Sequence, residues 1–307
     1  MSYPYLSDLF NTIFGTSLNV PIATFGSVVV IAIGISTLVA KREVVRYESL
    51  DLIPKAYMGS GKFVPVNQLI TDLIMTSVIF ALFGARIFHI LEYPDQFLNE
   101  PIDMIFSRGG FSIYGGLAFG LISGALYLRK HLVPIIPVLD ALSPSLLLGY
   151  AIGRIGCQLS GDGDWGVMAD LTLKPAWVPD WFWAQTYENN VLGITIPSPG
   201  VYPTPLYESI MAFCAFLFLW QLKKLGYKKG SVFFVYLLLS GYSRLWIEKI
   251  RINSEYHFLE LSFTQAELIS FGFIVIGSIW ILRNVENLHN LLLSSIFISA
   301  LFACTIF

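Results

Sequence analysis

Long apolar stretches separated by short charged segments make up most of this chain. A helix needs roughly 20 residues to span the hydrocarbon core of a bilayer, and eight stretches come close to that length. They cover residues 20–40, 69–91, 109–128, 132–152, 204–222, 231–250, 263–282 and 288–307. The pattern predicts an all-α integral membrane protein over 1–307, a single polytopic domain with seven transmembrane helices and an eighth apolar segment at 288–307.

Composition agrees with this interpretation. The chain is 55% hydrophobic, has a mean hydropathy of +0.66 and carries only 13% charged residues, against about 25% in a soluble domain. A net charge of -2 over 307 residues gives no basic excess that would suggest nucleic-acid binding. The first 19 residues contain no Lys or Arg, so we expect no cleaved signal peptide and a retained first segment.

Lys and Arg are concentrated in alternate connections, which predicts orientation because basic loops stay in the cytoplasm. The basic residues are Lys41, Arg42, Arg46, Lys55, Lys62, Arg129, Lys130, Lys223, Lys224, Lys228, Lys229 and Arg283. The amino terminus then lies on the outer side, together with short arms that carry a tryptophan cluster typical of a membrane surface. The arm at 153–203 is the longest of these.

A charged cluster follows the fourth apolar segment. Its 14 residues, Gly153–Gly166, include Arg154, Asp162, Asp164 and five glycines. A charge at the centre of a membrane helix costs roughly 2.5–3.5 kcal/mol, so charges at or near the bilayer indicate function. We therefore expect chemistry here.

Arg244, Glu248 and Arg251 have the spacing i, i+4, i+7 near the outer end of the sixth segment. This spacing predicts that all three lie on one helical face. Arginine stays charged when desolvated and binds phosphate with two parallel donors. The pattern favours a phosphate site over a helix end that merely reaches the lipid headgroups.

Three other polar positions fall inside apolar segments. Glycine pairs on both sides of Tyr114 indicate either a broken helix with Tyr114 in a cavity or close packing of two helices. Glu208 either pairs with an arginine or is desolvated and serves as a base. Arg86 needs a carboxylate or phosphate partner, and the neighbouring outer-side charges favour phosphate.

These motifs together resemble the bacterial prolipoprotein diacylglyceryl transferases. The resemblance rests on five or six motifs in order along most of the chain, since each motif alone is weak. They are Thr24-Phe25-Gly26, Gly84-Ala85-Arg86, the stretch from Arg108 to Gly116, Gly153-Arg154-Ile155-Gly156 with Trp165-Gly166, the stretch from Tyr202 to Glu208, and Arg244 with Glu248 and Arg251.

The resemblance implies transfer of a diacylglyceryl group from phosphatidylglycerol to the lipobox cysteine thiol of a preprolipoprotein. It also implies a bacterial cytoplasmic (inner) membrane location, an amino terminus in the periplasm and no cofactor. Two arginines of the family are essential for phosphate binding and catalysis, and the resemblance assigns these roles to Arg154 and Arg244. The expected substrate-binding residues are Arg86, Arg108, Gly156, Cys157, Gly166, Tyr207, Glu248 and Arg251.

The chain departs from the family where the thiol reacts. Tyr114-Gly115-Gly116 stands where the family usually has His-Gly-Gly, and Cys157 stands where it has Asn. A tyrosine with a pKa near 10 is a poor base at neutral pH. Tyr114 stays a catalytic candidate by position, and Glu208, Asp162 and His89, in that order, are the candidates for a substitute base.

The departures leave two alternatives open. One is a phospholipid-dependent transferase with a different acceptor, and the other is a non-catalytic protein that binds phospholipid or lipoprotein. A transporter is disfavoured because no inverted repeat is apparent. The three cysteines and four histidines show no metal-ligand spacing, so neither a metal site nor a disulfide framework is expected.

Overall fold

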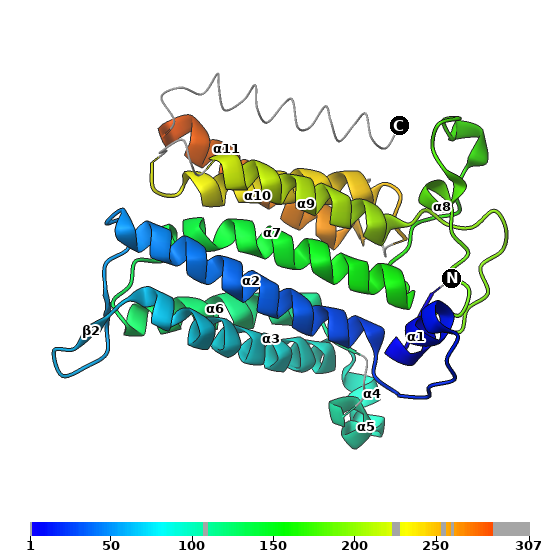
Figure 1. Ribbon diagram of the computed structural model, residues 1–307, viewed down its shortest axis with the longest axis horizontal. Coiled ribbons are helices and arrows are strands. Elements are labelled where there is room, and N and C mark those ends of the chain that lie inside the picture. Colours follow the sequence, from blue (N-terminus) through cyan, green and yellow to red (C-terminus); the bar gives the residue numbers. More distant parts are fainter. Residues whose placement is uncertain (1, 107–109, 223–227, 253–255, 259–260, 285–307) are drawn as a thin grey trace. The chain divides into compact units, whose positions relative to one another are not determined.

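The computed structural model describes residues 2–106, 110–222, 228–252, 256–258 and 261–284, and these are mostly helical (Figure 1). The long helices are α2 (Thr24–Ser49), α3 (Ile70–Glu92), α6 (Ile113–Lys130), α7 (Ile135–Ser160), α9 (Thr204–Leu222), α10 (Ser231–Glu248) and α11 (Gln265–Asn284). The short helices are α1 (Leu6–Phe14), α4 (Pro94–Asn99), α5 (Pro101–Phe106) and α8 (Asp180–Trp183), with 3₁₀ turns η1 (Val66–Gln68) and η2 (Leu171–Leu173). Two antiparallel hairpins pair β1 (Ala56–Tyr57) with β2 (Phe63–Val64) and β3 (Tyr256–Phe258) with β4 (Leu261–Phe263).

Five of the described helices, α2, α3, α7, α9 and α11, are long and apolar enough to cross a membrane. Helices α6 and α10 coincide with two further apolar segments predicted from the sequence. The segment 288–307 lies outside the described residues. The architecture confirms an all-α, multi-pass membrane protein.

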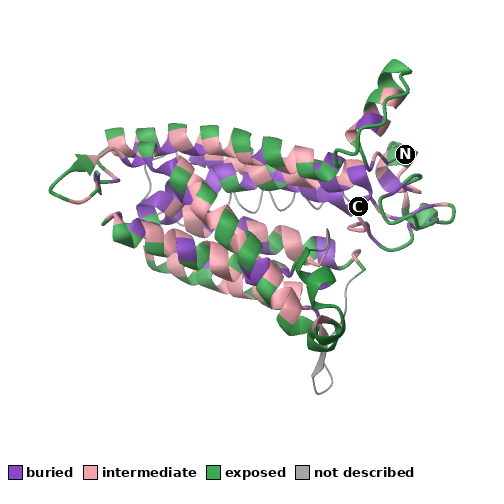
Figure 2. Cartoon of the chain, turned by 90° about the horizontal axis from the view of Figure 1, so that it is seen from below, coloured by how far each residue is buried: buried purple, intermediate pink, exposed green. Residues whose placement is uncertain are grey.

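Large apolar side chains lie exposed along the long helices. Val30, Phe83 and Leu121 are each more than three-fifths exposed, and exposed and half-buried residues follow much of the helical surface (Figure 2). A soluble protein rarely exposes so much contiguous apolar surface. Hydrocarbon chains of the bilayer are the natural solvent for these faces.

The chain divides into two compact units. Unit 1 comprises Met1–Ser36 and Ser143–Phe307, and unit 2 comprises Thr37–Leu142, so the boundary falls inside helices α2 and α7. In unit 1, α10 packs against both α9 and α11, and its core includes Leu219, Val235 and Ile281. In unit 2, a separate core includes Val44, Ile70 and Val138.

Helix α7 is longer than the predicted segment 132–152. It continues to Ser160, so Gly153-Arg154-Ile155-Gly156 lies within its last turns rather than in the loop expected there. The helix ends when Gly161 adopts a left-handed conformation (φ 62°), which glycine tolerates better than other residues. Arg154 is therefore held by a rigid helix, and only the acidic half of the motif is a loop.

The glycines around Tyr114 serve packing of α3 against α6. A Cβ on Gly84 would lie 2.4 Å from the carbonyl oxygen of Gly115, and a Cβ on Gly115 would lie 2.0 Å from that of Gly84. Both distances are shorter than any tolerable contact, so the two backbones touch at this crossing. Of the two interpretations of the glycine pairs, the structure supports helix packing, and Tyr114 stands in the first turn of an unbroken α6.

This contact predicts that Gly84→Ala lowers the stability of unit 2. The added methyl group would meet Gly115 O and Phe119 Cβ, and such overpacking costs about 1–3 kcal/mol. Thermal unfolding of the detergent-purified variant should show a lower midpoint. Gly34→Ala is the matched control because it is also helical and a Cβ there has nothing within 4 Å; equal midpoints for the two variants would contradict the packing argument.

Candidate functional site

A cluster of arginines and carboxylates forms the candidate site, and all of its members belong to unit 1. Arg154 comes from α7, Glu208 from the second turn of α9, and Arg244 and Glu248 from the last turns of α10. Asp164 comes from the loop after α7. The cluster thus joins three helices and one loop that are distant in sequence.

Glu208 is the centre of this cluster, and its side chain is only 3% exposed. Its Oε1 lies 3.0 Å from Arg244 Nη1, and its Oε2 lies 2.8 Å from Arg154 Nε. Arg251 Nη1 lies 3.7 Å from Oε2. Both Oε2 contacts are ion pairs outside hydrogen-bond geometry, and that of Arg251 is too long for a hydrogen bond. Of the two roles expected for Glu208, the structure shows the pairing with arginine.

Asp164 bridges two of the same arginines. Its Oδ2 accepts a hydrogen bond from Arg154 Nη1, and its Oδ1 accepts one from Arg251 Nη2. Burial alone would raise the pKa of Asp164, but the guanidiniums of Arg154 and Arg251 outweigh it and hold the pKa below its usual value. Asp164 therefore presents an ionised carboxylate to both arginines.

Glu248 completes the network on the far side of Arg244. Arg244 Nη2 lies 3.1 Å from Glu248 Oε2, as the i, i+4 spacing predicts. Thr264 donates its hydroxyl hydrogen to Glu248 Oε1 at 2.6 Å. Glu248 thus positions Arg244 between two carboxylates, its own and that of Glu208.

The expectation that Arg251 shares a helical face with Arg244 and Glu248 is wrong. Helix α10 ends at Glu248, and Arg251 lies in extended backbone that forms a β-bridge with Gly166. The amide of Val167 also donates to the carbonyl of Ile250 at 2.8 Å. Arg251 reaches the cluster because this short pairing attaches its backbone to the loop after α7.

Gly166 is needed for that pairing. A Cβ at this position would lie 2.4 Å from Ile250 O, so any other residue would separate the two strands. Its amide donates to Tyr202 O at 2.8 Å. The structure therefore gives Gly166 a role in holding the backbone of the site together. Its expected contact with substrate stays a prediction.

Cys157 and Asp162 form the edge of the cluster. The sulfur of Cys157 lies 3.7 Å from Arg154 Nη1, and it falls within 4.8 Å of carboxylate oxygens of Asp162 and Asp164. The sequence spacing did not predict this grouping of potential metal ligands. Guanidinium groups pair with both oxygens of Asp164, so this carboxylate already has cationic partners within the protein. Burial raises the pKa of Asp162, a hydrogen bond with the Cys157 thiol partly offsets this, and the charge of Asp164 raises it further.

Two other residues of unit 1 that we expect at the site make close contacts within the protein. A Cβ on Gly156 would lie 3.2 Å from Val28 Cβ, so its hydrogen permits close packing against α2. Tyr207 donates its hydroxyl hydrogen to Phe182 O at 2.7 Å, and the two rings stack at a tilt. Both residues shape the surroundings of the cluster.

The unit 2 candidates form a separate group. Arg86 Nη1 donates to the carbonyls of Met104 (2.9 Å) and Gly110 (3.0 Å), and its guanidinium lies 4.2 Å from the centre of the Phe111 ring. These contacts connect α3 to the segment before α6. A Cβ on Gly110 would lie 2.4 Å from His89 Nε2, so the His89 ring packs on this same segment. Arg108 lies outside the described residues.

Tyr150 is a member of the cluster that the sequence interpretation did not include. Its hydroxyl accepts a hydrogen bond from Arg154 Nε (3.1 Å) and donates one to Glu208 Oε1 (3.0 Å). The Arg154 guanidinium also lies over its ring, 5.1 Å from the centroid. The available signal was its position one helical turn before Arg154, which places the two side chains together.

Fold and site thus define a multi-pass membrane protein whose buried carboxylate gathers three arginines, an arrangement suited to an anionic substrate. The chain matches the prolipoprotein diacylglyceryl transferase family over residues 12–283, and it belongs to that family.

Individual relatives agree. The phosphatidylglycerol–prolipoprotein diacylglyceryl transferase of Leptospira interrogans serovar copenhageni is 28% identical over 341 residues, which covers 94% of this chain and 98% of the relative. The proteins of the same name from Bacillus cytotoxicus and Bacillus cereus are each 30% identical over 213 residues, 69% of this chain and 74% of theirs.

The pairing of Glu208 predicts that Glu208→Gln is strongly destabilising. Removing one partner of a buried ion pair leaves uncompensated charge and costs about 3–5 kcal/mol. The unfolding midpoint in detergent should fall clearly below that of Glu188→Gln, a control at an exposed position of the same unit. If both variants unfold at the same temperature, Glu208 does not hold the arginines.

Proposed function

We propose that this protein transfers a diacylglyceryl group from phosphatidylglycerol to the lipobox cysteine thiol of preprolipoproteins. The observation that carries the proposal is the convergence of Arg154, Arg244 and Arg251 on the buried carboxylate of Glu208. Membership of the family supports the choice of substrates, since the relatives are named for phosphatidylglycerol and prolipoprotein.

In this reaction the sulfur of the substrate cysteine attacks the diacylglyceryl carbon that carries the phosphate oxygen. A carbon–sulfur bond forms, the carbon–oxygen bond breaks, and glycerol phosphate leaves with the bonding electron pair. The thiol proton passes to a base. Guanidinium groups aimed at the phosphate stabilise the negative charge that develops on the leaving group.

Arg154 and Arg244 are the arginines that we assign to the phosphate. Arg244 has the more exposed side chain, 25% accessible against 12% for Arg154. Glu208 forms ion pairs with both arginines and so sets the distance between their two guanidinium groups. Arg251 and Glu248 then act as supports, one from the loop and one from α10.

Asp164 is the carboxylate that we expect the lipid phosphate to displace from the arginines. Its side chain is 32% exposed, whereas those of Glu208 and Glu248 are 3% and 1% exposed. It accepts one hydrogen bond from each of two arginines, as a phosphate oxygen pair would. Displacing it keeps the charge of the site balanced when the lipid binds.

Asp162 is the base that we favour for the thiol proton. Both oxygens of Glu208 face guanidinium groups, so Glu208 suits an anchor better than a proton acceptor. The raised pKa of Asp162 brings its carboxylate closer to the range in which a base works near neutral pH. Tyr114 and His89, the other candidates, belong to unit 2.

The membrane arrangement that fits this chemistry has seven transmembrane helices and an outer-leaflet site. The inner membrane of a bacterium supplies both substrates on its outer side, so the amino terminus and the loop after α7 would face the periplasm. The basic residues in alternate loops support this orientation. The segment 288–307 would form the eighth apolar segment.

The transfer is tested directly with purified protein in detergent, phosphatidylglycerol and a lipobox peptide. Mass spectrometry of the peptide should show the added mass of a diacylglyceryl group on its cysteine. A peptide with Ser in place of that cysteine should gain nothing. Phosphatidylglycerol binding without any thioether product would overturn the proposal in favour of a non-catalytic binding protein.

Arg154→Ala and Arg244→Ala should each reduce transfer by at least about a hundredfold, the usual effect of removing a donor to a developing anion. Arg283→Ala, at an exposed position in the last turn of α11, is the matched control and should retain activity. Initial rates at several lipid concentrations separate the loss of binding from the loss of turnover. Full activity in either cluster variant would exclude that arginine from the phosphate site.

Tyr150→Phe should lower kcat/KM about tenfold, because it removes the hydroxyl that hydrogen bonds to two charged groups while the ring stays in place. Tyr242→Phe on α10 removes an exposed hydroxyl and serves as the control. In an Arg154→Lys background, Tyr150→Phe should cost much less than in the wild type if the two residues act as a unit. Additive losses would instead assign Tyr150 a role independent of Arg154.

A further inference from the structure

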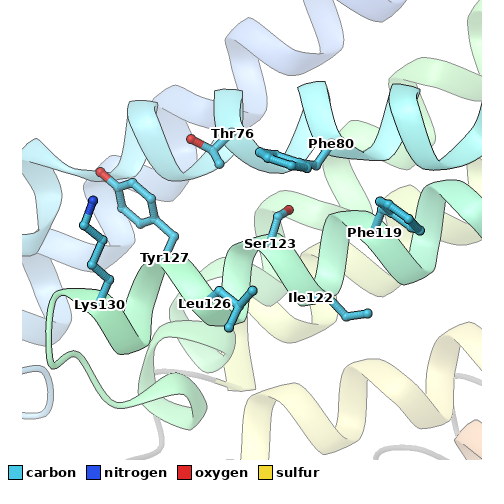
Figure 3. A pocket seen from close by; sticks show the side chains of 8 residues that line it. All are labelled: Thr76, Phe80, Phe119, Ile122, Ser123, Leu126, Tyr127 and Lys130. Atoms are coloured by element: carbon cyan, nitrogen blue, oxygen red, sulfur yellow. The ribbon is translucent and has the colours of Figure 1, made fainter.

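An elongated groove runs along unit 2, between α3 and α6 (Figure 3). It has a volume of about 410 Å³. One wall comes from Thr76 and Phe80 on α3, and the other comes from a single face of α6. The α6 residues that line the groove are Phe119, Ile122, Ser123, Leu126, Tyr127 and Lys130.

The groove follows from the way the two helices pack. On α6, Gly116, Gly120 and Gly124 lie four residues apart and face α3, where a Cβ on Gly124 would lie 2.9 Å from Ser77 Oγ. Because glycine brings the helix backbones close, the larger side chains next to this line are displaced sideways. They leave a furrow beside the contact that protein does not fill.

The length of the groove matches one leaflet of a bilayer. From Phe119 to Lys130 the helix rises about 16 Å, and half of a roughly 30 Å hydrocarbon core is about 15 Å. The lining is apolar over most of this length, since the hydroxyl of Ser123 is taken up by Gly120 O at 3.0 Å. An extended acyl chain has the shape and the chemistry to fill it.

Positive charge is confined to one end. Lys130 lies in the last turn of α6 beside Arg129, is exposed, and forms no ion pair with a carboxylate among the described residues. Tyr127 lies one turn before the helix end, where an aromatic ring with a hydroxyl suits the membrane interface.

We propose that this groove is a binding site for an anionic phospholipid. One acyl chain lies along Phe119, Leu126 and Phe80, and the phosphate of the headgroup pairs with Lys130. A net negative headgroup is selected because no carboxylate of the described residues pairs with Lys130. The site is separate from the arginine cluster in sequence and in composition, and it does not depend on the proposed transfer reaction.

Photolabelling tests the site with the full-length protein in detergent micelles. The probe is a phosphatidic acid with a diazirine on one acyl chain, and a phosphatidylcholine with the same chain is its comparison. After irradiation and proteolysis, mass spectrometry should find label on α6 between residues 119 and 130. The anionic probe should label about fivefold more strongly, the preference that one lysine gives near a membrane surface.

Two pairs of variants separate this site from general contact with lipid. Lys130→Gln should reduce labelling by the anionic probe to the level of the phosphatidylcholine probe, whereas Lys62→Gln, at an exposed loop position in the same unit, should not. Leu126→Trp should fill the groove and remove the label. Leu121→Trp, also exposed on α6 but outside the groove, should preserve it.

The proposal is overturned by equal labelling with both probes, by labelling that survives Lys130→Gln, or by cross-links from a second copy of the chain across this face. Phosphatidic acid is not the donor of the proposed transfer reaction. Loss or absence of transferase activity would therefore leave this test intact, and the two proposals can fail independently.

Discussion

The buried carboxylate of Glu208 is the interaction on which the site depends. Three guanidinium groups lie within 4 Å of its oxygens, and they come from α7, α10 and the segment that follows α10. Arginines placed so close would repel one another in a medium of low dielectric constant unless an anion lay between them. Glu208 supplies that anion from within the fold, so the cationic site exists before any substrate arrives.

This preorganisation also explains the order of burial in the cluster. The two carboxylates that fix the arginines, Glu208 and Glu248, are nearly inaccessible, whereas Asp164 is the most exposed of the three. The two carboxylates that hold Arg244 thus lie deep in the cluster, and Asp164 lies nearer the surface. Because the donors are already fixed, binding of a ligand does not have to order them, which lowers the free-energy cost of binding.

Much of the fold could be predicted because bilayer thickness imposes a length on each apolar segment, and seven of the predicted segments correspond to helices of the structure. Helix ends were less predictable. Helix α7 extends to Ser160 and α10 ends at Glu248, and near both ends the backbone pairs with loops distant in sequence, Ser160 with Val191 and Ile250 with Val167. The residue types of the site were visible as charges near the membrane, and the i, i+4 pair of Arg244 with Glu248 followed from helix geometry. The pairing of Glu208 with Arg154, and the contribution of Tyr150, depend on which helices pack together, which a single sequence does not specify.

The short backbone pairing between Gly166 and Arg251 has a consequence for how this site can vary. It fixes the position of the loop after α7 relative to the end of α10, so that Asp164 and Arg251 form an ion pair beside the bridge. One residue inserted between Asp164 and Gly166 would move the carboxylate to the opposite side of the extended chain and break the bridge to Arg251. The next residues are paired as well, because Met168 forms a β-bridge with Val201 and the amide of Ala169 donates to Gly200 O. Length changes in this region should therefore accumulate beyond Ala169, and the number of residues between Gly153 and Gly166 should stay constant.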